Sequence, residues 1–90
     1  MFRVWGKIMN GSHMVQDHVA EDGRTGVNIN RRLIDCLDEL CREFDLAKPI
    51  WLDKNYEELN KFGKTSFRRD NFVEPVSFTE FEIEIIEMDE

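Results

Sequence analysis

Four glutamates near the end of the chain have the spacing of an interaction surface. Glu80, Glu82 and Glu84 alternate with apolar residues, and Glu87 follows them. Because side chains alternate between the two faces of a strand, the pattern predicts a strand with one buried and one acidic face. Successive carboxylates would stand about 6.6–6.8 Å apart, comparable to the phosphates of one nucleic-acid strand. Such a row can bind a cationic partner or imitate nucleic acid, and it can also be a solvated face that protects an edge strand.

Three arginines form a second candidate site, which would bind an anion. Arg31 and Arg32 fall in the first turn of a predicted helix, and Arg24 lies in the glycine-flanked loop before it. The N–H groups and the dipole of a helix N-terminus favour anions, and guanidinium groups bind phosphate or carboxylate. The alternative is that these arginines pair with acids of the same chain, Asp35 among them.

The only thiols and imidazoles are Cys36, Cys41, His13 and His18. The two cysteines differ by about 140° around a helix, so they cannot easily form a disulfide with each other. The two histidines would lie on opposite faces of one strand, which argues against a shared metal ion. We therefore predict no catalytic residue, metal or cofactor, and keep a cysteine nucleophile served by His18 as an alternative.

The segment 61–69 is basic and contains two phenylalanines, a composition that can bind single-stranded nucleic acid. Its lysines and arginines would contact phosphates while Phe62 and Phe67 stack on bases. A small domain needs its phenylalanines for the core, however, and the net charge of −7 repels phosphate. We keep nucleic-acid binding as an alternative and expect this segment to form ion pairs with the acidic end of the chain.

The elements that position these residues begin with a predicted β-hairpin. A loop at residues 10–13 pairs Ile8 with Val15 and Val4 with Val19, which collects the aliphatic side chains on one face.

An amphipathic helix is predicted from about Arg31 to Leu46. Its apolar residues fall within an arc of roughly 120°, with acidic residues on the other side. Asn30 is the expected N-cap. Lys48-Pro49 ends the helix, because the residue before a proline avoids the helical conformation.

The second half of the chain is less regular. Residues 50–52 are predicted as a short strand, and Asn55 with Glu58 as the capping pair of a short second helix that stops at Gly63. Residues 66–73 fit a loop or a strand, and a proline separates them from the acidic strand.

Composition narrows the class of protein. Ninety residues with 41% apolar content are enough for one small domain, residues 1–90. No apolar run reaches the ~18 residues that cross a bilayer, and no secretory leader is recognisable, so we expect a cytoplasmic protein without membrane contact. The excess of 19 acids over 12 bases argues against nucleic acid and anionic membranes, which favours a protein partner.

Three segments, Trp5-Gly6-Lys7, residues 48–55 and residues 78–87, resemble a family of small uncharacterised bacterial proteins. The resemblance implies a bacterial origin and carries over no site residue.

These observations predict a single α+β domain. It has a small, mostly antiparallel sheet with an N-terminal hairpin, one main amphipathic helix, a short second helix and an acidic C-terminal strand. The predicted function is a non-catalytic, acidic protein-interaction module. The alternatives are an inhibitor that imitates nucleic acid, a small cysteine-dependent enzyme, and a single-strand binder that uses residues 61–69.

Overall fold

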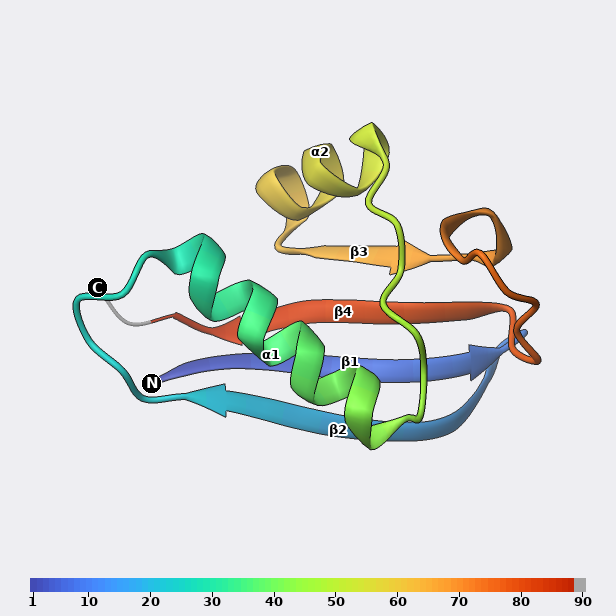
Figure 1. Cartoon of the computed structure of the whole chain (residues 1–90), viewed down its shortest axis with the longest axis horizontal. Coiled ribbons are helices and arrows are strands. Elements are labelled where there is room, and N and C mark those ends of the chain that lie inside the picture. Colours follow the sequence, from blue (N-terminus) through green and yellow to red (C-terminus); the bar gives the residue numbers. More distant parts are fainter. Residues whose placement is uncertain (89–90) are drawn as a thin grey trace.

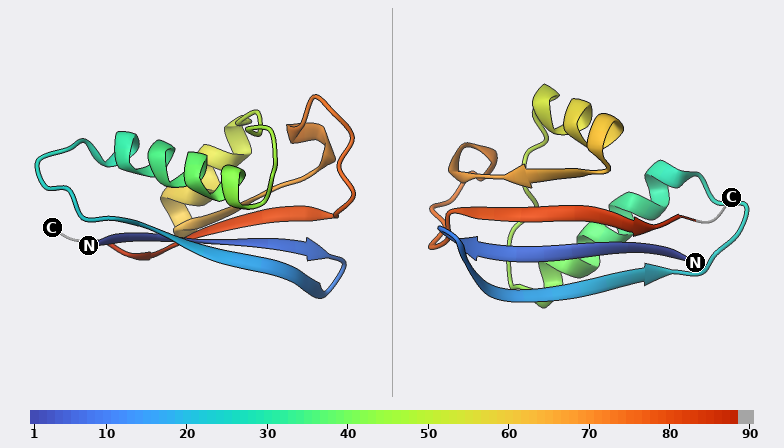
Figure 2. Two further views of the ribbon diagram at one scale, coloured as in Figure 1. Left: turned by 60° about the horizontal axis from the view of Figure 1, so that its bottom comes forward. Right: turned by 180° about the vertical axis from the view of Figure 1, so that it is seen from behind.

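The structure is a computed structural model that describes residues 1–88. In chain order its elements are β1 (Phe2–Asn10), β2 (His13–Asp22), α1 (Ile29–Glu43), α2 (Asp53–Phe62), β3 (Lys64–Phe67), the 3₁₀ turn η1 (Arg69–Asn71) and β4 (Glu80–Glu87). The strands form one antiparallel sheet in the order β2-β1-β4-β3. Helix α1 crosses one face of this sheet and α2 lies near the β3 edge, whereas the opposite face carries no helix within residues 1–88 (Figures 1 and 2). The predicted α+β class with an N-terminal hairpin is confirmed.

The core lies between the sheet and α1. It contains, among others, Phe2, Val4 and Ile8 of β1, Leu37, Leu40 and Phe44 of the helix region, and Phe81 and Ile83 of β4. The apolar face of β4 thus packs against the helix region, where the rings of Phe44 and Phe81 lie 5.7 Å apart. Gly6 lets α1 approach closely, because a Cβ atom at this position would lie 2.8 Å from Cδ2 of Leu40.

The register of the hairpin differs from the prediction. Ile8 pairs with Gln16 rather than with Val15, because a bulge adds one residue to β2 near the turn. The shift turns Ala20 into the core and leaves Val19 38% exposed on the open face. The aliphatic side chains of β2 thus do not share one buried face.

Helix α1 begins slightly earlier than predicted and ends before the predicted boundary. Asn28 rather than Asn30 is the N-cap, and its side chain accepts a hydrogen bond from the backbone N–H of Asn30 at 2.8 Å. The helix ends at Glu43, and Asp45 adopts a left-handed backbone conformation with φ of 56°. The chain thus leaves the helix before it reaches the Lys48-Pro49 step.

Residues 50–52 are irregular, so the prediction of a strand there is wrong. The backbone of Ile50 bonds to η1 instead of the sheet: its N–H donates to the carbonyl of Asn71 at 2.6 Å, and its carbonyl accepts from Asn71 Nδ2 at 2.7 Å. These bonds satisfy the backbone polar groups that a strand would have paired in a ladder.

Helix α2 begins at Asp53, before the residue that the capping pattern suggested. The N-cap is Leu52 and Asn55 is the third residue of the helix, so the predicted capping pair of Asn55 with Glu58 is wrong. From this position Asn55 Oδ1 accepts a hydrogen bond from the N–H of Leu52 at 3.0 Å. The helix ends as predicted at Gly63, whose φ of 73° is readily adopted by glycine. The ambiguous segment after it divides into β3 and the turn η1.

Candidate functional site

The predicted acidic row lies on the open face of the sheet, on an inner strand between β1 and β3. Each of its glutamates has a cation from another strand or its flank within 4.0 Å: Lys7 for Glu82 (3.2 Å) and Glu84 (3.8 Å), Arg68 for Glu80 (3.4 Å), and Arg3 for Glu87 (3.1 Å). The Arg3–Glu87 pair is exposed and the Lys7–Glu82 pair is partly buried, and together these pairs neutralise the field of the row. A binding role for these glutamates stays a prediction.

The whole open face alternates in charge from strand to strand. The register places Glu21, Arg3 and Glu87 in one row across the sheet and Asp17, Lys7 and Glu82 in another. Trp5 lies between the two rows: Lys7 Nζ is 4.0 Å from its ring centroid, and its Nε1 donates to Asp17 Oδ2 at 2.9 Å. This face is therefore a network of paired charges.

The three predicted anion-binding arginines lie around two aspartates of the same chain. Arg24 Nη2 contacts Asp22 Oδ2 at 2.5 Å and Asp35 Oδ2 at 2.7 Å, and Arg31 Nε lies 3.6 Å from Asp35. Arg32 Nη2 donates to the backbone carbonyl of Asp22 at 2.7 Å. These contacts are the pairing with acids of the same chain that we gave as the alternative to an anion site. Binding of an external anion stays a prediction.

Acid should weaken the fold through Asp22. Hydrogen bonds from Arg24 lower the pKa of Asp22 from 3.8 to about 2. A carboxylate with a lowered pKa contributes stability that is complete above the unfolded pKa and is lost as the pH falls through the folded pKa. We therefore expect the melting temperature to fall between pH 3.8 and about 2, with this part of the fall missing in Asp22→Asn. Circular dichroism melts across this range measure it.

A second variant checks the cause. Arg24→Gln removes the donor that lowers the pKa, so it should flatten the same part of the curve. A melting-temperature difference between wild type and Asp22→Asn that did not change with pH would contradict the assignment.

The cysteine-dependent enzyme receives little support. Cys36 and Cys41 are 2% and 4% exposed, and burial raises the pKa of each thiol to about 11, so both stay protonated at neutral pH. His18 Nε2 lies 2.8 Å from Glu39 Oε2 and joins β2 to α1. Within residues 1–88, no three His, Cys, Asp or Glu side chains are grouped to hold a metal ion.

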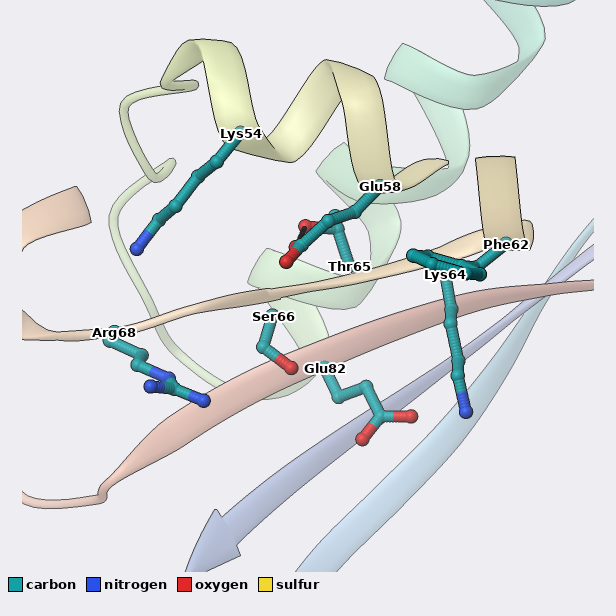
Figure 3. Close-up of a pocket in the computed structure, with 8 residues that line it drawn as sticks. All are labelled: Lys54, Glu58, Phe62, Lys64, Thr65, Ser66, Arg68 and Glu82. Carbon is teal, nitrogen blue, oxygen red and sulfur yellow. Dashed lines mark hydrogen bonds between the residues drawn. The ribbon is translucent and has the colours of Figure 1, made fainter. Parts of the chain in front are cut away.

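The basic segment 61–69 lines a polar hollow of about 230 Å³ between α2 and β3 (Figure 3). Three cations, Lys54, Lys64 and Arg68, share it with Glu58 and Glu82. Of the two phenylalanines that would have stacked on bases, Phe67 is fully buried and Phe62 is 63% exposed. A single exposed ring next to carboxylates does not favour binding of a nucleic-acid strand.

A larger and apolar hollow of about 540 Å³ lies between α1 and α2, and we call it the helix groove. Its lining residues are Asn30, Leu33, Ile34, Trp51, Tyr56, Leu59 and Asn60. None of them is charged. Ile34 and Tyr56 are 45% and 55% exposed, so an apolar surface meets solvent here.

Packing fixes the floor of the helix groove. The ring of Trp51 lies 5.0 Å from that of Tyr56 and 5.1 Å, edge to face, from that of Phe67. Phe67 belongs to the core, and the neighbouring Ile50 is tied to Asn71, so Trp51 is held on both sides. Sequence reasoning missed the groove because it placed Trp51 in a strand. A usable signal was the spacing of Tyr56 and Leu59, three residues apart on one helix face.

Comparison of the chain with family models, curated proteins and solved structures gave no match. The resemblance to small bacterial proteins therefore stays a prediction. In the described part of the chain no helix is long and apolar enough to cross a membrane.

Proposed function

We propose that this protein is a non-catalytic interaction module that binds a partner protein through the helix groove. The observation that carries the proposal is the groove itself: about 540 Å³, lined by apolar and amide side chains without a charge, and open to solvent at Ile34 and Tyr56. Hollows of this size and lining bind apolar groups, and contiguous exposed apolar surface is characteristic of interaction sites.

The partner that fits the helix groove is an amphipathic helix. A groove between two helices accepts the apolar side chains of a third helix, spaced three and four residues apart. Asn30 and Asn60 line the groove and supply amide donors and acceptors. The net charge of −7 attracts a cationic partner and speeds the encounter, so we expect lysine or arginine on the outer face of the partner helix.

The anchored tryptophan supports the same function. Trp51 is held by Tyr56 and Phe67 and does not need to be ordered on binding. Pre-organised aromatic residues at the centre of an interface contribute disproportionately to affinity.

A selection of helical peptides from a displayed library tests the proposal. We expect the selected peptides to combine apolar residues three and four apart with lysine or arginine. Ile34→Ser should weaken their binding about tenfold or more, because it removes an apolar contact from the groove. Fluorescence anisotropy measures the dissociation constants.

The control is Ile86→Ser, the same exchange at a residue that is 46% exposed, against 45% for Ile34, and lies outside the groove. It should leave binding unchanged. Equal weakening by both variants, or selected peptides without the apolar spacing, would refute binding in the groove.

The alternative role as an inhibitor that imitates nucleic acid has less support, because cations neutralise the acidic row. A bacterial cytoplasmic location belongs to the proposal as well.

A further inference from the structure

The two edges of the sheet are built differently. At β3, the outward carbonyl of Ser66 accepts a hydrogen bond from Asn55 Nδ2 at 3.0 Å, and α2 lies beside the strand (Figure 1). At the other edge, β2 pairs with β1 and, within residues 1–88, with no further strand. β2 spans ten residues and contains neither proline nor lysine. Proteins usually protect an exposed edge strand by making it short or by placing proline or lysine on it. β2 has none of these features, so its outer edge is available for pairing.

The sheet geometry identifies the backbone groups at the open edge. Met9 turns its carbonyl toward β4, where it accepts a hydrogen bond from the N–H of Thr79 at 2.9 Å. The N–H and C=O groups of successive residues in a strand point to opposite sides, so the odd-numbered residues of β1 turn these groups to β4 and the even-numbered ones turn them to β2. The even-numbered residues of β1 pair with even-numbered residues of β2. The N–H and C=O groups of Asp17, Val19 and Glu21 therefore point outward, away from the sheet.

The side chains of the same three residues determine what can pair there. Asp17, Val19 and Glu21 are exposed on the open face in the order acid, apolar, acid. Glu21 also contacts Arg3 Nε at 3.0 Å and Asp17 accepts a hydrogen bond from Trp5 Nε1 at 2.9 Å, but Asp17 has no cation of the chain within 4.0 Å among residues 1–88. Residues of an added strand would lie directly opposite them, so opposite charge at the two ends and an apolar residue in the middle are favoured. On the helix side, Glu39 and Glu43 of α1 lie 2.8 and 3.9 Å from the ring of His18 and add negative charge near the edge.

We propose that the open edge of β2 binds an extended, basic segment of a partner protein as a fifth strand. Its residues opposite Asp17, Val19 and Glu21 are cationic, apolar and cationic. Main-chain hydrogen bonds supply affinity and the alternate side chains supply specificity. A second copy of this chain fits less well, because β2 contains three acids and no lysine or arginine. The site is separate from the helix groove, and the inference does not depend on it.

A labelled peptide of sequence Thr-Lys-Thr-Val-Thr-Lys-Thr tests the proposal. It reads the same in both directions, so either strand orientation presents the lysines to Asp17 and Glu21. We expect it to bind in an anisotropy titration, and Thr-Glu-Thr-Val-Thr-Glu-Thr to bind at least about tenfold more weakly. The double variant Asp17→Lys, Glu21→Lys should reverse this preference.

Backbone methylation tests the pairing without changing the protein. If the peptide pairs antiparallel to β2, the amide nitrogens of its lysines and valine face β2, so methyl groups on them should abolish binding and methyl groups on the threonine nitrogens should not. Parallel pairing reverses this pattern, because the threonine amides then face β2. Val19→Pro removes an outward N–H and no ladder bond, so it should fold and lose the peptide. Ile34→Ser should bind the peptide as wild type does, which separates this site from the helix groove.

Three results would overturn the proposal. The first is equal binding of the lysine and glutamate peptides, and the second is indifference to the position of the methyl groups. The third is a concentration-dependent dimer in sedimentation that Val19→Pro dissociates, because the occupant of the edge would then be a second copy of the chain.

Discussion

Replacement of Asn55 by leucine should lower the free energy of unfolding by about 3 kcal/mol or more. Asn55 is fully buried, and its amide makes four hydrogen bonds: it accepts from Leu52 N–H (3.0 Å) and Asn71 Nδ2 (3.0 Å), and donates to Thr65 Oγ1 (2.8 Å) and the Ser66 carbonyl (3.0 Å). Leucine can form none of these hydrogen bonds. Each buried donor or acceptor that loses its partner lowers the free energy of unfolding by about 1–3 kcal/mol. Urea unfolding followed by circular dichroism measures the loss.

The matched control is Asn60→Leu, the same exchange on the same helix at an exposed residue. It should change the free energy of unfolding by no more than about 0.5 kcal/mol. If the two variants unfolded at the same urea concentration, the amide network would not be what joins α2 to β3 and η1.

This network shows where local sequence patterns cease to be informative. The spacing of Asn55 to Glu58 predicted that Asn55 begins α2, whereas Asn55 is the third helical residue and bonds back to the N–H of Leu52. Its bond to Asn71 could not be foreseen, because the partner lies 16 residues away in a segment that fitted both loop and strand. The same bonds explain why residues 50–52 are not a strand. Asn71 satisfies the backbone of Ile50, and periodicity within a three-residue run contains no information about such a partner.

Elements with a long periodic pattern were predictable because burial alone determines them. The alternation that placed Phe81 and Ile83 inside and Glu82 outside holds in the structure, as does the apolar face of α1. The alternation within the sequence of a strand is enough to predict which face of the sheet each side chain occupies. Whether a side chain on that side is free or paired depends on the neighbouring strand.

The acidic row illustrates that difference. Its strand and its exposed face were predicted correctly, but its cations Lys7 and Arg3 come from the first strand of the chain. Their positions beside Glu82 and Glu87 depend on the sheet order and on a bulge between β1 and β4. The helix groove is likewise a product of non-local packing, because one of the two rings that hold Trp51 is Phe67 of β3.

Phe81→Ala is expected to lower the free energy of unfolding by about 3–5 kcal/mol. Phe81 is fully buried, and its ring lies 5.7 Å from those of both Phe44 and Phe67. Alanine would leave a cavity between α1 and β3 and remove two aromatic contacts. Small domains are stable by only about 5–15 kcal/mol in total, so a large part of the stability depends on this ring. Denaturant unfolding followed by tryptophan fluorescence measures the effect.

The same variant links the core to the helix groove, because the aromatic contacts continue from Phe81 through Phe67 to Trp51 and Tyr56. In conditions where Phe81→Ala is still folded, Trp51 loses support from below, and peptides selected for the groove should bind more weakly. Phe62→Ala is the control: its ring is 63% exposed, so it should cost no more than about 0.5 kcal/mol. If both variants unfolded at the same denaturant concentration, Phe81 would not connect the core to the floor of the groove, and Trp51 would need another anchor.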